Sequence, residues 1–195
     1  MPKNKLKDYI IILASASPRR QQFLREMGLN FKVHPIHMEE VYPDHLKGEE
    51  ISDYLAKLKA TGYKNSLGAK DILITSDTVV WHNNESLAKP ADPEDAFAML
   101  RTLSNDWHQV ITSVCFTTKD QQQTVHHFTK VKFKELTDGE IKYYIQNYNP
   151  FDKAGGYGIQ DWIGLIGIEE IQGSYTNVVG LPTQLVYKTL MAIVG

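Results

Sequence analysis

The sequence contains one cysteine, Cys115, and has no long apolar run. An internal disulfide is therefore impossible, and Cys115, within an apolar segment, is expected to be a small core residue rather than a nucleophile. The cysteine cluster of a structural zinc site is also missing. No stretch approaches the roughly 18 apolar residues of a membrane span, so no membrane partner is expected. A reducing cytoplasm is the expected compartment.

The sequence also lacks a strong charge of either sign. Lysine and arginine number 21 and aspartate and glutamate 23, which gives a formal net charge of −2. Proteins whose main task is to hold duplex nucleic acid usually carry a clear basic excess, so nucleic acid is not an expected partner. A chain of 195 residues, 42% of them hydrophobic, can bury a sizeable core without staples. With no repeat or linker, residues 1–195 are expected to form a single domain, either undivided or built as two lobes.

Strand-like and helix-like patterns alternate along the chain. Continuous or alternating apolar runs predict strands at residues 9–14 (buried on both faces), 31–36, 71–76, 79–87 (a small hairpin), 110–118 and 124–134. Periodic apolar residues with capping signals predict helices at residues 18–27, 49–63, 92–103, 137–148 and 183–194. Ser17 is the expected N-cap of the first helix, and Thr137 and Glu140 form an expected capping box. In the helix at 49–63, Ile51, Tyr54, Leu55 and Leu58 are expected on one apolar face. This interleaving predicts a mixed α/β fold, in which a mixed twisted sheet is flanked by helices.

The segment Ser-Ala-Ser-Pro-Arg-Arg at residues 15–20 joins the first predicted strand to a helix. Free N–H groups at a helix N-terminus favour an anion, and the guanidinium groups of Arg19 and Arg20 can grip phosphate oxygens. Basic residues in a first helical turn oppose the helix dipole, a conflict that an anionic ligand would resolve. The alternative is a well-capped surface helix with two solvated arginines. The spacing is not that of a Walker A loop.

Carboxylates follow two of the predicted strands. Asp77 ends the strand at residues 71–76, the place where open α/β sheets hold ligands, and could bind Mg²⁺ or act as a general base. An ordinary turn-forming aspartate is the alternative. Glu39 and Glu40 follow the second strand and form a candidate metal-ligand pair, or simply an acidic surface. Lys89, which precedes a proline, is either a ligand contact or a solvated lysine.

Residues 152–160 read Asp-Lys-Ala-Gly-Gly-Tyr-Gly-Ile-Gln. Three glycines within four positions indicate a backbone that approaches a ligand closely, and the amide of Gln160 could read a base edge. A glycine-rich loop with ordinary turn chemistry is the alternative. The seven histidines have no metal-ligand spacing.

Taken together, these segments resemble the Maf family of nucleoside triphosphate pyrophosphatases. The matching pieces lie in the family's order and extend over nearly the whole chain: residues 13–20, 39–40, 56–60, 77–79, 88–90, 152–160, 173–175 and 179–182. The resemblance implies a fold around a central cleft, similar to that of inosine triphosphate pyrophosphatases. It also implies Mg²⁺ or Mn²⁺ as cofactor, hydrolysis between the α- and β-phosphates, and a homodimer.

The resemblance also assigns roles, residue by residue. Ser15, Ser17, Arg19 and Arg20 lie in the family's phosphate-binding motif. Asp77 matches the acidic residue that acts as general base or metal ligand.

Four further positions complete the implied site. Glu40 matches a metal-linked carboxylate, with Glu39 beside it. Lys59 matches the lysine of a helix facing the cleft, Lys89 the lysine before proline, and Gln160 the base-reading glutamine.

Within the family, two arginines after Ser-Pro together with the string ending in Ile-Gln are typical of the branch that acts on dTTP and UTP. Arg19, Arg20, Lys89 and Gln160 are therefore the expected specificity residues. Three positions depart from the common pattern, namely Ser76, Ala88 and Gly156, but none removes a charged group. Two other functions remain open: a pyrophosphatase for modified nucleotides, and a nucleotide-binding regulator of cell division with little turnover. Whether the role is pool cleaning or division control also stays open.

Overall fold

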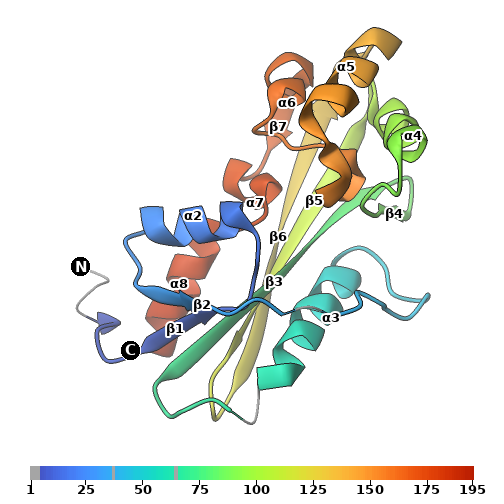
Figure 1. Cartoon of the computed structure of the whole chain (residues 1–195). Helices are drawn as coiled ribbons and strands as arrows, with labels where there is room; N and C mark the ends of the chain where they lie inside the picture. The colour runs from blue at the N-terminus through green and yellow to red at the C-terminus, as the bar shows by residue number, and fades with distance from the viewer. Residues whose placement is uncertain (1–4, 37, 64–65) are drawn as a thin grey trace. The chain divides into compact units, whose positions relative to one another are not determined.

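A computed structural model describes residues 5–36, 38–63 and 66–195 (Figure 1). The chain forms two compact units. The first unit comprises Met1–Asp77, Thr112–His127 and Gly180–Gly195, and the second comprises Thr78–Ile111 and Phe128–Val179. The chain passes between the units inside three strands, because β3 (Asp71–His82), β5 (Trp107–Thr117) and β6 (Gln122–Phe133) each contain a boundary.

The sheet is mixed. Its seven strands follow the order β2-β1-β3-β5-β6-β7, and β4 pairs with β3. The strand β1 (Ile10–Leu13) runs parallel to both β2 (Phe31–Val33) and β3. The pairs β3–β4 and β6–β7 are antiparallel, with β4 at Glu85–Leu87 and β7 at Ile168–Gln172. These strands and their flanking helices confirm the expected α/β fold class.

In the first unit, helices cover both faces of the parallel strands (Figure 1). The helices α2 (Pro18–Glu26) and α8 (Thr183–Ile193) pack through Leu24 and Leu190 on a core that includes Ile72 and Ile74 of β3. The helix α3 (Glu49–Ala60) packs on the opposite face through small side chains, Ala56 and Ala60, and a short 3₁₀ turn, Thr61–Tyr63, follows it. Small residues let α3 approach the sheet closely, and this brings side chains of α3 such as Lys59 within reach of β3.

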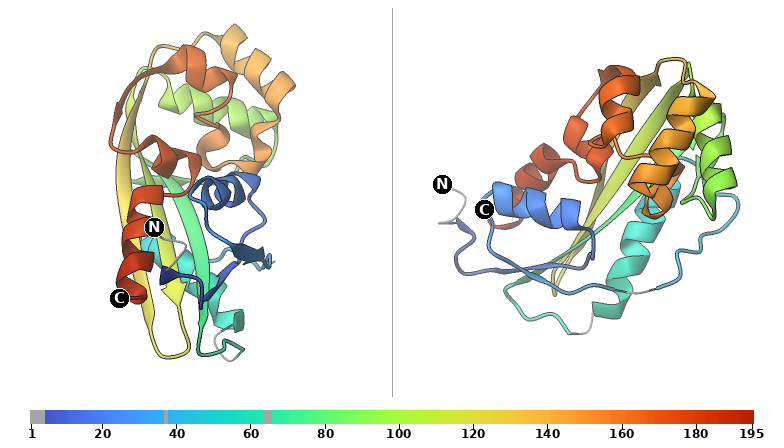
Figure 2. Two further views of the ribbon diagram at one scale, coloured as in Figure 1. Left: turned by 90° about the vertical axis from the view of Figure 1, so that its left-hand side faces the viewer. Right: turned by 45° about the horizontal axis from the view of Figure 1, so that its top comes forward.

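The helices of the second unit pack on a separate hydrophobic core. They are α4 (Pro93–Leu103), α5 (Asp138–Tyr148), α6 (Trp162–Gly167) and α7 (Tyr175–Val179), with 3₁₀ turns at Pro150–Asp152 and Ala154–Gly156. Figure 2 shows α4, α5 and α6 grouped together in both views. Their shared core includes Leu100, Ile141 and Phe133. In the described part of the chain, no helix is long and apolar enough to cross a membrane.

The capping signals in the sequence correctly predicted where helices begin. The Ser17 hydroxyl accepts a hydrogen bond from the Arg20 N–H at the start of α2, and Pro18 occupies the first turn. Thr137 and Glu140 form the predicted capping box of α5. The turn between β3 and β4 places Asn83 and Asn84 at positive φ, as a tight hairpin requires. Cys115 is buried, as expected.

Three expectations about strands and helix faces were wrong. The strand β3 does not end at Asp77 but continues to His82, because the β-branched and aromatic residues 79–81 extend it. The strand β1 is not buried on both faces, since Ile10 at its start is 41% exposed. Tyr54, predicted on the apolar face of α3, is 38% exposed, because the buried side of this helix runs through Ser52, Leu55 and Ala56 and leaves Tyr54 outside it.

The segment that follows the first glycines of residues 152–160 contains regular elements that the sequence pattern did not predict. The residues 155–173 contain α6 and β7 as well as turns. Glycine weakens helix and strand propensities, so a pattern dominated by glycine is indistinguishable from a loop.

A buried histidine joins the core of the second unit to this stretch. His108 is 2% exposed, and its Nε2 lies 2.6 Å from the Tyr157 hydroxyl. Burial, with a smaller effect of nearby His82, lowers the pKa of His108 from 6.5 to about 3. His108 is therefore neutral in the native protein at every pH above that value.

This buried histidine predicts an acid-sensitive stability. Below pH 6.5 the unfolded chain takes up a proton at His108 that the native chain refuses until about pH 3. The free energy of unfolding should therefore fall with falling pH in that window, by up to about 1.4 kcal/mol per pH unit from this group. His108→Gln should flatten the slope measured by urea unfolding, and exposed His45→Gln should leave it unchanged. Equal slopes for wild type and His108→Gln would contradict the assignment.

Candidate functional site

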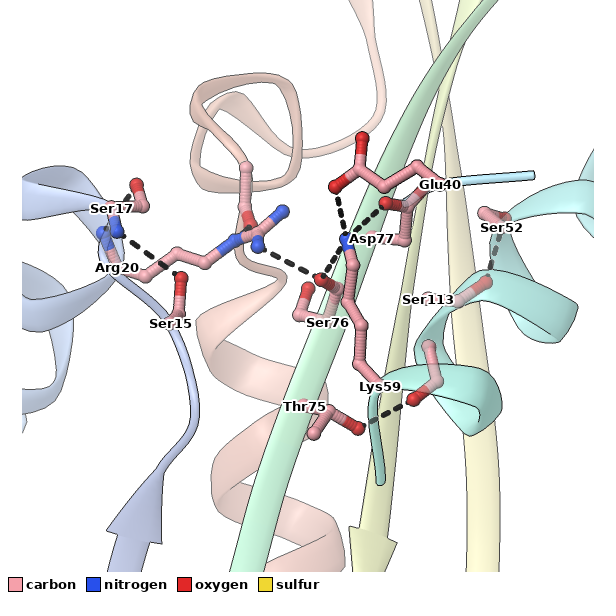
Figure 3. Close-up of polar contacts among 12 residues, drawn as sticks. Ser15, Ser17, Arg20, Glu40, Ser52, Lys59, Thr75, Ser76, Asp77 and Ser113 are labelled. Carbon is pink, nitrogen blue, oxygen red and sulfur yellow. Dashed lines mark hydrogen bonds and ion pairs between the residues drawn. The ribbon is translucent and has the colours of Figure 1, made fainter. Parts of the chain in front are cut away.

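Asp77 lies within β3 and is the centre of the polar cluster in the first unit (Figure 3). It is 6% exposed. Burial raises the pKa of Asp77 above its ordinary 3.8, while Lys59 and, to a lesser degree, Arg20 act in the opposite direction. A carboxyl group in this environment is a better proton acceptor than a solvated aspartate, which is what a general base requires.

Lys59 is held between two carboxylates. Its Nζ lies 2.6 Å from Asp77 Oδ1 and 2.8 Å from Glu40 Oε1, and it donates to the Ser76 carbonyl at 3.5 Å. Figure 3 shows its side chain extending along β3 to reach both acids. Glu40, rather than its neighbour Glu39, makes this contact. The structure thus joins three of the predicted site residues.

The position of Lys59 depends on how α3 is attached to the sheet. The Thr75 hydroxyl donates to the Ala56 carbonyl at 2.6 Å, and both groups are buried. One turn earlier in α3, the Ser52 and Ser113 hydroxyls are 2.7 Å apart, and Ser113 also donates to a carboxylate of α3. Sequence reasoning missed Thr75, although a residue two positions before Asp77 must share its face of the strand.

Arg20 connects the start of α2 to two other segments of the first unit. Its Nε donates to the Gly180 carbonyl at 2.9 Å and its Nη1 to the Ser76 carbonyl at 2.8 Å. Burial lowers the pKa of Arg20, with Asp77 acting against this effect, and the group remains a cation. The alternative of a solvated Arg20 is therefore wrong, because two of its donors bind backbone carbonyls.

The loop before α2 has the hydrogen-bond pattern of a compact turn. Ser15 is buried, and its Oγ accepts from the Ser17 N–H at 3.2 Å. The Ser17 Oγ caps α2 by accepting from the Arg20 N–H at 3.5 Å. The first turn of α2 holds no acidic residue, and Arg19 is half-buried beside Arg20. Two cations therefore adjoin a helix N-terminus, an arrangement that favours an anion.

The carboxylates of Asp77 and Glu40 fit a hard divalent cation. Each turns one oxygen to Lys59 Nζ and carries a second oxygen, so the two carboxylates lie close enough together to serve as ligands of one ion. Mg²⁺ is commonly held by one or two carboxylates and completed by substrate phosphates and water. Among the residues with described coordinates there is no group of three or more metal-ligating acids, histidines or cysteines, so phosphate and water oxygens would have to complete the coordination.

Lys89 and Gln160 lie in the second unit. Lys89 is exposed and follows β4, before a buried proline. Gln160 is half-buried, and its Nε2 donates to Asp161 Oδ1 at 3.2 Å. Their roles toward a ligand of the first unit remain predictions.

Comparison with known proteins yields a consistent set of relatives. A family model described as Maf-like protein matches residues 10–193. A dTTP/UTP pyrophosphatase of Flavobacterium johnsoniae is 53% identical over 194 residues, 100% of both chains. A protein of the same name from Flavobacterium psychrophilum is 56% identical over 191 residues, 98% of each chain.

A solved structure shows the same fold. The Staphylococcus aureus Ham1 protein aligns with a TM-score of 0.53 at 13% identity, over 94% of this chain and 99% of that chain. At this identity the likeness concerns the fold alone, and it agrees with the expected fold class.

The contacts of Arg20 predict a structural cost for its removal. Arg20→Met removes the donors that Arg20 gives to the Gly180 and Ser76 carbonyls, and it removes one of the positive charges near Asp77. Urea unfolding should show a loss of about 3 kcal/mol. Arg25→Met is the matched control, because Arg25 is exposed on the same helix and contacts Gln21, and should cost under about 0.5 kcal/mol. Equal losses would show that Arg20 does not hold these segments together.

Proposed function

The chain belongs to the Maf family, and from this premise we propose that it is a nucleoside triphosphate pyrophosphatase acting on dTTP and UTP. The products are the nucleoside monophosphate and pyrophosphate. The observation that carries the proposal is the buried Asp77 beside Lys59, in the same unit as a helix N-terminus flanked by two arginines. The names of the relatives, at 53% and 56% identity over nearly the whole chain, supply the substrate class.

The charges of the first unit suit a triphosphate. A nucleoside triphosphate carries about four negative charges, and cations with aimed N–H donors stabilise charge developing on the leaving pyrophosphate. Arg19, Arg20 and the N–H groups at the start of α2 are proposed to hold phosphate oxygens, with the Ser15 and Ser17 hydroxyls as donors. Lys59 supplies further positive charge in this unit, and the resemblance to the family leads us to propose the same role for Lys89 of the second unit.

Asp77 is proposed as the general base. It accepts a proton from the water that attacks the α-phosphorus in line, and pyrophosphate leaves on the opposite side. Its raised pKa supports this role, because a base must take up a proton readily near neutral pH. Lys59 donates to Oδ1 of this carboxylate and so fixes its orientation toward the water.

We propose Mg²⁺ or Mn²⁺ as cofactor, held by Asp77 and Glu40. When bound, the ion supplies neutralisation of phosphate charge. The resemblance to the family also leads us to propose that the protein works in the cytoplasm as a homodimer, in cleaning of the nucleotide pool.

Gln160 is proposed to read the pyrimidine base, and Arg19, Arg20 and Lys89 to contribute to specificity. An amide can donate and accept at a base edge, so it can distinguish bases of similar size.

The basicity of Asp77 should be required for turnover. Asp77→Asn keeps the shape of the side chain but removes its basicity, so kcat for UTP should fall by at least about 10²-fold. Pyrophosphate release with Mg²⁺ measures the effect, and thermal unfolding checks that the variant is folded. Asp71→Asn on the same strand is the matched control and should keep normal turnover, since its partner is the Gly68 N–H. A near-normal kcat for Asp77→Asn would exclude Asp77 as the base.

The choice of substrate should follow the pyrimidine base of the nucleotide. In wild type, pyrophosphate release should be fast with dTTP and UTP and slow with CTP, dGTP and 7-methyl-GTP. Gln160→Ala should reduce the preference for UTP over CTP, because a side-chain amide at a base edge contributes about 1–3 kcal/mol of discrimination. An unchanged preference would place specificity elsewhere. Nucleotide binding without turnover across the panel would instead favour the regulator of cell division.

A further inference from the structure

The amide of Gln160 is held in one orientation by its neighbour in sequence. Its Nε2 donates to Asp161 Oδ1 at 3.2 Å. A carboxylate only accepts hydrogen bonds, so the NH₂ group of the amide, and not its oxygen, must face Asp161. The amide oxygen Oε1 is therefore directed away from Asp161 as an acceptor.

Asp161 is itself anchored. The Tyr144 hydroxyl on α5 donates to Asp161 Oδ2 at 2.8 Å and accepts from the Gly158 N–H at 3.0 Å. Burial, followed by the bond to Asp161, raises the pKa of Tyr144, so its hydroxyl keeps the proton that it donates. Lys153 Nζ lies 3.8 Å from Oδ2 and offsets the charge. Asp161 is thus held in place as a hydrogen-bond acceptor.

Gly158 lies against the polar ends of the Gln160 and Asp161 side chains. A Cβ on Gly158 would lie 2.6 Å from both Gln160 Nε2 and Asp161 Oδ2. A side chain at this position would displace the Gln160 amide or the Asp161 carboxylate from where they now lie. The arrangement of amide, carboxylate and tyrosine is therefore built into the loop rather than being a chance surface contact.

We propose that Asp161 is a specificity-determining positioning residue, which holds Gln160 so that Oε1 accepts the N3–H of uracil or thymine. This inference rests on the proposed function and deepens it. Cytosine has a lone pair at N3, which an amide oxygen repels, so the fixed orientation discriminates against CTP. Uracil and thymine share the N3–H, so one orientation accepts both UTP and dTTP.

The test changes the chemistry of Asp161 without changing its size. The amide introduced by Asp161→Asn can offer either a donor or an acceptor to Gln160, so the Gln160 amide can turn and present its NH₂ to cytosine N3. The ratio of kcat/KM for UTP over CTP should fall at least about 5-fold. The ratio is measured on one enzyme preparation, so partial unfolding does not change it. Asp161→Ala, which removes the acceptor and adds no donor, should lower the ratio in the same direction.

Two controls separate positioning from general damage. Asp138→Asn, at the start of α5 and paired with Arg101, should leave the ratio unchanged. In a Gln160→Ala background, Asp161→Asn should cause no further change, because it acts through the amide that is already gone.

The outcomes are distinguishable. An unchanged ratio in both Asp161 variants, or an equal additional fall in the Gln160→Ala background, would overturn the role of Asp161 and leave the proposed function standing. No hydrolysis of UTP or dTTP by wild type would overturn the proposed function itself.

Discussion

The first unit depends on keeping a carboxylate charged where water hardly reaches it. Asp77 is 6% exposed, and moving an ionised carboxylate out of water costs several kcal/mol unless cations and donors replace the water. Lys59 provides a direct ion pair at 2.6 Å, and Arg20 a second nearby positive charge. The balance still leaves the pKa of Asp77 raised, which agrees with its proposed role as a base.

That compensation works only if Lys59 is placed accurately, and the fold supplies the placement through hydroxyl groups. Thr75 of β3 binds the α3 carbonyl of Ala56, and Ser113 of β5 binds α3 one turn earlier. Figure 3 shows these bonds on the same side of β3 as Lys59. Ser52, Ala56 and Lys59 lie along one face of the helix. The two attachments therefore fix both the position of α3 along its axis and its rotation about that axis. The small side chains of α3 serve the same end by allowing the close approach.

Local features of this structure could be predicted from the sequence, whereas contacts between distant segments could not. The Ser17 cap and the Thr137 capping box determine backbone geometry within a few residues, and the structure confirms both. The charged site residues could be chosen because charges near buried strands need partners. The resemblance to the Maf family then assigned a role to each of them. The bonds of Arg20, however, reach carbonyls 160 and 56 residues away, and a carbonyl carries no side-chain signal. A charge within an apolar run normally predicts the end of a strand, but tertiary partners compensate Asp77, so β3 continues through it.

The two units use a carboxylate in opposite ways, and the difference follows from its partners. Asp77 is paired with cations, which lower its pKa, while burial raises it, and we propose that it accepts a proton. Asp161 receives a hydroxyl and an amide NH₂, with the ammonium of Lys153 farther off at 3.8 Å. Neutral donors carry no net charge, so what such a carboxylate determines is the direction of the hydrogen bonds that it accepts. It orients the amide of Gln160, and an orientation, unlike a charge, can distinguish two bases of the same size.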